Sequence, residues 1–478
     1  MNLIQRPFQS VHSLPLKHVS GLFILTLVCV LTAAEAFAQR NVSYRELAAQ
    51  NRAPGLYIDH NVIKAEAGEP NVWLHYRFGH DVLRFRQIAG TTGNVSTERF
   101  EATAELSVQI FEASEPGQNG EARRGSAIKT LTWRGQTRAA DFDETSRRDL
   151  FLNANLSAAL PPGRYAYSTS LTLDGRPLQL RQSTRFFTVP DFESSDAPPL
   201  YFVNPADLGS DQFEIINFGR AVLYAQDFDA LLVVPGTDST YRVIVNQVEP
   251  GGRDTTTVRR VHESDVAADQ IRSIQSMRIS ESAQALPLLG LTEAEADADG
   301  AFHLLQLNIP NRKFQNASFV IQVKKGDELL TERFFRNLWL DIPTSLLNID
   351  VAIRKMEIIL DRDTHRELRR GNEQQRIKNF RAFWEARDPE PETDYNPVMV
   401  EFFRRVDMAF DRFTTPNQPG YDSDQGRTLI RFGEPERITR RLPTGSAAIE
   451  VWQYSDREFV FEATSGFGEY RLLRTNRL

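Results

Sequence analysis

Residues 104–110 read AELSVQI. In an extended chain the four apolar side chains of this stretch project to one side and the three polar ones to the other, because successive side chains alternate across a strand. Such alternation is typical of a strand with one face in a core. The same period recurs at Leu74, Tyr76 and Phe78. We therefore predict β-sheet structure around both stretches.

Turn signals delimit the first β-rich region. Asp174-Gly175 separates two alternating runs, residues 165–172 and 178–189, and an Asp-Gly pair in such a place favours a tight hairpin. Strand signals at spacings near ten residues, with Gly, Asn and Pro between them, are typical of an immunoglobulin-like sandwich. We predict a β-sandwich-like domain over residues 55–190, followed by an acidic, Pro-flanked linker over 190–199.

A second β-rich region covers residues 200–340 with a less regular pattern. Glu249-Pro250-Gly251-Gly252 is a turn cluster between two apolar runs. Residues 264–298 look partly helical. We therefore predict a second β-sandwich-like domain over residues 200–340 with a partly helical insertion.

From about residue 345 the apolar period becomes helical. Asn372 and Asn396 are expected to cap two helices, with Pro397 at the first helical position of the second. Short strands are predicted after these helices, the first of them over residues 428–432. Helices followed by strands favour an α+β domain over residues 345–478. The predicted fold class is thus a mainly β N-terminal part, made of two β-sandwich-like domains, followed by an α+β C-terminal domain.

The N-terminus has the features of a secretory signal peptide. Arg6 and Lys17 precede a 13-residue apolar run, LFILTLVCVLTAA, and small residues then stand at Ala36 and Ala38. A charged start, a short apolar core and an Ala-x-Ala end are the features of a cleaved leader. We predict a signal peptide over residues 1–38 with cleavage after Ala38. The chain is then exported, to the periplasm, the cell surface or the medium.

Composition narrows the classes of partner. The 478 residues have a formal net charge of −7 and a single cysteine, which lies in the predicted leader. Without a basic surplus, nucleic acid is not an expected partner. The apolar run of the leader is shorter than the length needed to cross a bilayer, and no run beyond it reaches that length, so no membrane span is expected in the mature chain. The expected partner is a protein or a glycan of the cell envelope.

The C-terminal region carries an ordered series of short motifs. They are FWEARDP at residues 383–389, GYDSDQGR at 420–427, FGEP at 432–435 and VWQY at 451–454. This series resembles the GWxTD domain, a family found in exported bacterial proteins. Tyr421 and Ser423 stand where the family name has Trp and Thr, and Gln425 stands where Arg is usual. The resemblance implies no established activity. The positions that carry it, with no role assigned, are Trp384, Asp388, Pro389, Gly420, Tyr421, Ser423, Asp424, Gly426, Arg427, Gly433, Pro435 and Trp452.

The 420–436 segment is open to two interpretations. In the first it is turn chemistry that determines the fold: Ser423 and Asp424 hydrogen-bond to backbone amides, and Gly426 helps turn the chain into the predicted strand. In the second, Tyr421, Asp424 and Arg427 are the floor of a polar ligand site.

Motifs of known chemistry are few. The sequence has no nucleophile elbow, no HExxH, no P-loop and no dinucleotide fingerprint, so neither a metal nor a cofactor is expected. Residues 295–300, EADADG, resemble the opening of a calcium loop, but the twelfth position is Gln306, which cannot supply a bidentate carboxylate. An acidic solvated turn is the alternative.

Three functions follow as hypotheses. The preferred one is an exported, non-enzymatic interaction or surface protein with a GWxTD module. The second is an envelope-polymer hydrolase that uses carboxylates of the C-terminal module, since carboxylate geometry is invisible in a sequence. The third is a calcium-tuned binding protein.

Overall fold

The computed structural model describes most of the chain from Ser43 to Leu478. The segments outside the described residues are 1–42, 51–54, 65–68, 89–98, 115–122, 181–183, 193–197, 235–239, 251–255, 267–269, 281–285, 296–300, 443–446 and 465–467. The predicted signal peptide and its cleavage site at Ala38 therefore lie outside the described residues. By its internal contacts the chain forms two compact units. Among the described residues, unit 1 combines 43–50 with those of 341–478, and unit 2 contains those between 55 and 340.

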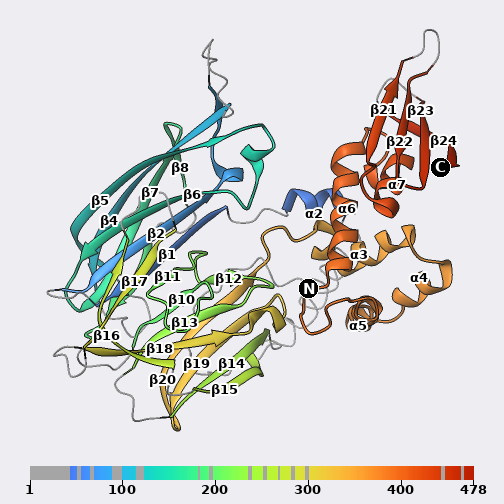
Figure 1. The fold of residues 1–478 in the computed structure, drawn as a ribbon. Helices are drawn as coiled ribbons and strands as arrows, with labels where there is room; N and C mark the ends of the chain where they lie inside the picture. The colour runs from blue at the N-terminus through green and yellow to red at the C-terminus, as the bar shows by residue number, and fades with distance from the viewer. Residues whose placement is uncertain are drawn as a thin grey trace, which may run out of the picture. The chain divides into compact units, whose positions relative to one another are not determined.

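Unit 2 begins with two antiparallel sheets that face each other (Figure 1). One has the order β1-β2-β6, from β1 (Leu56–Ile63), β2 (Asn71–Gly79) and β6 (Phe151–Ala159). The other is built on β4 (Phe100–Ala113), β5 (Arg124–Ala139) and β7 (Gly163–Leu173), with β3 (Arg86–Gln87), β8 (Arg176–Leu178) and β9 (Thr184–Val189) at its margins. Tyr76 and Phe78 from the first sheet and Val108 from the second share one core and are fully buried. This is the sandwich that the period-two pattern predicts.

The rest of unit 2 adds two further sheets. One has the order β10-β13-β18-β16-β17-β11 and the other β12-β20-β19-β14-β15. Their strands are β10 (Leu200–Val203), β11 (Gln212–Glu214), β12 (Ala221–Leu223), β13 (Phe228–Val234), β14 (Tyr241–Pro250), β15 (Thr256–Asp265), β16 (Ile271–Ile279), β17 (Leu288–Glu293), β18 (Phe302–Ile309), β19 (Ser318–Lys325) and β20 (Glu328–Leu338). Phe228, Phe319 and Phe335 fill the core between them.

The two pairs of sheets meet through a third apolar cluster. Ile63 and Trp73 of the first pair pack with Tyr201 of the second, and the Tyr201 hydroxyl donates to the Val62 carbonyl at 2.7 Å. Residues 53–340 thus form one compact unit that contains both sandwiches. The predicted domain boundaries at 55–190 and 200–340 stay predictions.

The predicted helical insertion over residues 264–298 is wrong. Most of the described residues of this segment belong to strands, the end of β15 followed by β16 and β17, and none of them is in an α-helix. The pairing of β16 with β17 shifts register between Ile274 and Ser276. Such a bulge breaks the period-two alternation from which a strand is recognised.

Unit 1 has helices first and a sheet last. The helices are α2 (Tyr44–Gln50), α3 (Ile349–Lys355), α4 (Arg362–Leu368), α5 (Glu373–Glu385), α6 (Pro397–Phe413) and α7 (Asp424–Phe432), with short 3-10 turns η5 (Thr344–Leu347) and η7 (Gly420–Asp422) among them. The sheet has the order β21-β22-β23-β24, from β21 (Arg437–Arg441), β22 (Ile449–Gln453), β23 (Arg457–Ala463) and β24 (Tyr470–Arg477). The predicted fold class, β-rich sandwiches followed by an α+β domain, is confirmed.

Two helix starts follow their predicted caps. The Asn372 side chain accepts from the Gln375 amide at 2.9 Å, and that of Asn396 accepts from Met399 at 2.9 Å with Pro397 in the first turn. The predicted strand over residues 428–432 is wrong, because these residues form the second half of α7. Leu429 and Ile430 are neighbours and both are buried, which a helix between two layers allows.

No helix of the described residues is long and apolar enough to cross a membrane.

Candidate functional site

Two glycines of the family motif let three backbone segments approach closely. A Cβ atom on Gly420 would overlap the Ala409 carbonyl oxygen of α6 and lie 2.7 Å from the Thr414 nitrogen. A Cβ atom on Gly426, in the first turn of α7, would overlap the carbonyl oxygen of Gly420 itself. Only glycine fits both places without moving a backbone. The motif glycines therefore lock η7 between α6 and α7.

Ser423 and Asp424 hold the start of α7. The Ser423 hydroxyl accepts from the Gly426 amide at 3.0 Å and donates to the Gly420 carbonyl at 2.7 Å, so it caps the helix and closes the turn before it. The Asp424 carboxylate accepts from the Leu472 amide at 2.7 Å, which ties the helix start to β24. An anionic side chain also suits the first turn of a helix.

Tyr421 lies in a cluster of rings. Its ring stacks on Phe410 at 5.9 Å between centroids and meets the edge of Tyr44 at 5.3 Å. The Lys355 ammonium stands 3.2 Å from the Tyr421 ring centroid, a cation–π contact. Burial lowers the pKa of Lys355 to about 8, although Asp422 and Glu357 oppose the shift. Lys355 is thus buried, with its ammonium against the ring of the motif residue Tyr421.

Asp407 of α6 is the second unusual titratable group. Its carboxylate accepts from the Tyr44 hydroxyl at 2.5 Å and from the Thr344 amide at 2.8 Å. Burial raises the pKa of Asp407 to about 6, and Asp411 adds a like charge. Both donors are neutral, which explains why they do not cancel the penalty of burial.

The remaining motif residues are structural in geometry. Trp384 is buried among Phe380, Phe402 and Phe403, and its carbonyl accepts from the Asn396 side chain at 2.8 Å. The turn after α5 contains Asp388, which accepts from the Glu390 amide at 3.0 Å, and the exposed Pro389.

Gly433 ends α7 with a positive φ of 80°, and its carbonyl accepts from the Tyr454 hydroxyl at 2.8 Å. Pro435 follows, half-buried, in the turn before β21.

Trp452 and Gln425 share one buried carboxylate. Glu450 of β22 is 3% exposed and accepts from the Trp452 indole at 2.7 Å, from the Gln425 amide at 3.1 Å and from Arg440 at 2.7 Å. Gln425 therefore supplies a neutral donor where the family usually has Arg, and Arg440 supplies the positive charge.

The structure does not bring Tyr421, Asp424 and Arg427 together as the polar ligand site that the second interpretation predicts. Tyr421 is 7% exposed beneath Tyr44 and Lys355, Asp424 is engaged by the Leu472 amide, and only Arg427 is exposed. No group of three or more His, Cys, Asp or Glu among the described residues has the arrangement of a metal site. The described motif residues thus act on one another and on backbone groups.

The structure contradicts the second half of the predicted calcium loop. Residues 296–300 lie outside the described residues, but the next segment is the strand β18 instead of the helix that follows a calcium loop. The Gln306 amide in β18 donates to Asp229 at 2.8 Å inside unit 2.

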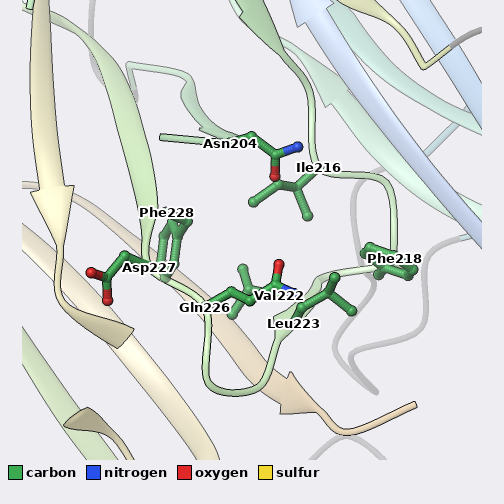
Figure 2. Close-up of a pocket in the computed structure, with 8 residues that line it drawn as sticks. All are labelled: Asn204, Ile216, Phe218, Val222, Leu223, Gln226, Asp227 and Phe228. Atoms are coloured by element: carbon green, nitrogen blue, oxygen red, sulfur yellow. The ribbon is translucent and has the colours of Figure 1, made fainter. Parts of the chain in front are cut away.

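A small hollow occurs in unit 2, away from the motif in sequence. Figure 2 shows residues of its lining, among them Phe218, Leu223 and Phe228 together with Asn204 and Asp227. Asp227 already pairs with Arg312 at 2.8 Å.

Three residues of unit 1 escaped the sequence analysis: Tyr44, Lys355 and Asp407. A signal for the first existed, because Ser43 and Glu46 form a capping box with Tyr44 between them. The Glu46 carboxylate accepts from the Ser43 amide at 2.8 Å, and the Ser43 hydroxyl accepts from the Glu46 amide at 3.2 Å. Nothing local distinguishes Lys355 or Asp407 from an ordinary charged residue on a helix.

Comparison with known proteins identifies the C-terminal module. Residues 345–477 match the family model of the GWxTD domain, so the resemblance seen in the motifs is confirmed. No curated protein is a significant match to the chain.

Solved structures give only weak likenesses. Red sea bream transglutaminase has 11% identity over 61% of this chain, with a TM-score of 0.16, and this chain spans 32% of its length. The C-terminal domain of the Streptococcus pyogenes antigen I/II-family protein AspA has 8% identity over 59% of this chain and all of its own, with a TM-score of 0.14. The BSP domain of a biofilm-associated protein has 8% identity over 64% of this chain and 55% of its own, with a TM-score of 0.15. TM-scores this low carry no argument on fold or function.

Proposed function

We propose that this chain is an exported, non-enzymatic binding protein of the cell envelope, and that one solvent-facing β-sheet of unit 2 binds a glycan. The observation that carries the proposal is an array of hydroxyl and amide side chains on β4, β5 and β7. The motif residues of the C-terminal module give the proposal indirect support, because their side chains already contact other groups within that module.

The array follows from strand register. Ser107 of β4 lies opposite Thr132 of β5 and Ser170 of β7, and Gln109 of β4 lies opposite Thr130 and Ser168. Because the alternate residues of β4 point into the core, these six side chains share the solvent face. The buried core beneath keeps their spacing fixed.

The chemistry of this array favours a glycan. Its six side chains donate and accept hydrogen bonds without a charge or an aromatic ring, whereas protein-binding hot spots are rich in Trp, Tyr and Arg. Charges beside it are paired, with Arg134 at 3.3 Å from Glu105 and Arg138 at 3.4 Å from Glu101. A neutral, flat, hydrogen-bonding surface matches the hydroxyls of a polysaccharide.

The test is a sedimentation assay of the mature chain with isolated peptidoglycan, with lipopolysaccharide and with dextran as a neutral control. We expect binding to one of the envelope polymers, and a loss of at least tenfold when Thr132 and Ser170 are both replaced by Lys. The matched control is Val258→Lys, a change at a strand residue of another sheet that is 61% exposed. Equal binding by the two variants, or binding to neither envelope polymer, would contradict the proposal.

Export has its own test. N-terminal sequencing of the protein from the envelope fraction of its host should give Gln39 as the first residue. Finding the uncleaved chain in the cytosol would contradict the proposal.

The hydrolase hypothesis has one observation in its favour, the raised pKa of Asp407 next to Asp411 on α6. However, Asp407 is covered by Tyr44 and bonded to it. A substrate would have to displace α2 before it could reach this carboxylate, so we place this reading second. Turnover of either envelope polymer by the mature chain, abolished by Asp407→Asn, would reverse the order.

A further inference from the structure

Helix α2 is too short to be stable alone. It has seven residues, Tyr44–Gln50, and isolated helices below about 12–15 residues are marginal in water. Its capping box satisfies amides at the start of the helix and adds no contact for the rest of it. The helix must therefore be held by what it docks against.

Its docking face has two anchors. Tyr44 is 4% exposed and Leu47 is 7% exposed, while Arg45 and Glu46 are exposed to solvent. Residues three apart lie on one face of a helix, so the two anchors point the same way. This is the spacing by which an amphipathic helix fills a groove.

The surface that receives Tyr44 comes from three separate elements of the C-terminal module. Phe410 of α6 lies 4.6 Å from the Tyr44 ring, and Tyr421 of η7 lies 5.3 Å away. One oxygen of the Asp407 carboxylate accepts a hydrogen bond from the Tyr44 hydroxyl, and the other accepts one from the Thr344 amide of η5. The aromatic walls and the acceptor together match a phenol better than any other side chain.

We propose that the GWxTD module of this chain is a helix-binding module, whose groove between η5, α6 and η7 recognises a Tyr with a Leu three residues later and is occupied in cis by α2. The motif aromatic Tyr421 is one wall of the groove. The family match begins at residue 345, so the bound segment lies outside the matched range.

A peptide of residues 41–52 tests the proposal in trans. The receiving protein is the mature chain with Tyr44→Ala and Leu47→Ala, which vacates the groove. Fluorescence anisotropy of the labelled peptide should show binding at least tenfold tighter than that of the same peptide carrying Tyr44→Ala. The unaltered mature chain, with its groove filled, should bind the peptide at least tenfold more weakly than the vacated chain. Equal binding of the two peptides, or of the two proteins, would overturn the proposal.

Hydrogen exchange on the unaltered mature chain needs no vacated variant. The amides from Leu47 to Gln50 should exchange at least tenfold more slowly than in the free peptide, because only docking protects so short a helix. Tyr44→Phe, which keeps the ring and removes the hydroxyl, should reduce this protection by at least threefold, and the exposed Arg45→Gln should leave it unchanged. Exchange at the free-peptide rate in the unaltered chain would overturn the proposal.

Discussion

The two units bury a carboxylate in different ways. In unit 2, Asp59 is 5% exposed and faces a cation, with Arg333 at 3.8 Å, besides the amides of His60 and Arg220. In unit 1, Asp407 faces only neutral donors and a like charge, and its pKa is raised to about 6. Both aspartates join segments that are far apart in sequence, yet one is ion-paired and the other is a proton-sensitive contact.

This difference predicts that the two units lose stability for different reasons. Asp59 connects β1 of the first sandwich with β20 of the second, so it supports the union of the two sandwiches. Asp407 connects α2 with the C-terminal module through bonds that depend on protonation. We expect the stability of unit 2 to fall when its ion pair is mutated, and the stability of unit 1 to fall as pH rises.

The largest expected effect is that of Asp59→Ala. The change removes the carboxylate that faces Arg333 and accepts from two backbone amides, and leaves the guanidinium with the Leu200 carbonyl as an acceptor. Removal of one partner of a buried pair costs about 3–5 kcal/mol. Calorimetry should show the loss in the transition of unit 2. The control is Glu105→Ala, whose ion pair with Arg134 is exposed, and its effect should stay within about 0.5 kcal/mol. Similar losses for the two variants would remove the contrast.

The next largest loss of stability is expected for Gly420→Ala. Its Cβ atom would overlap a carbonyl oxygen of α6, and overpacking of this kind costs about 1–3 kcal/mol. The loss should appear in the transition of unit 1 and leave that of unit 2 in place. Gly468→Ala is the matched control, since a Cβ atom there meets no heavy atom within 4 Å, although its φ of 79° adds some strain. An equal effect of the two would contradict the role of crowding at Gly420.

The pH dependence of unit 1 is expected to be smaller. The folded pKa of Asp407, about 6, lies above its ordinary value of 3.8, so between these values the unfolded chain binds fewer protons than the folded one. The stabilisation is therefore present below about pH 4 and is lost as pH rises through 6. The groups around Asp407 are Tyr44, Asp411 and the Thr344 amide.

Scanning calorimetry between pH 5 and 7.5 should show a fall of about 1–2 kcal/mol in the stability of unit 1. Asp407→Asn, which cannot titrate, should flatten the slope. A slope that survives this substitution would assign the pH dependence to another group.

Ser423→Ala should have the smallest effect. It removes the cap of α7, and the loss of such a cap costs about 1 kcal/mol. Ser423→Thr keeps the hydroxyl and should restore most of the stability, as measured by the midpoint of thermal unfolding of unit 1. If Thr is as destabilising as Ala, the cap is not what Ser423 contributes.

Local signals predicted the local features. The alternation at residues 104–110 predicts the strand β4 correctly, because side chains with a period of two lie on opposite faces of a strand. Asp174-Gly175 gave the turn between β7 and β8, where both residues have positive φ, 46° and 73°. The caps Asn372 and Asn396 depend on side-chain bonds within three residues, so the sequence alone contains them.

Features decided by distant contacts were missed. The sequence pattern makes Gly426 part of a turn into a predicted strand, but packing against Gly420 requires glycine inside α7. Helix α2 has its hydrogen-bond partner 363 residues further along the chain. No periodicity within seven residues can predict such a partner.

The chain order of unit 1 has a consequence for synthesis. Helix α2 is translated before the 288 residues of unit 2, whereas η5, α6 and η7 are translated after them. During vectorial emergence, N-terminal segments usually fold first, yet here a helix that precedes unit 2 has to wait for elements that follow it. A nascent chain thus carries the Tyr44 segment without its partners until η5, α6 and η7 have been translated, and the docking of α2 reports that these three elements are in place.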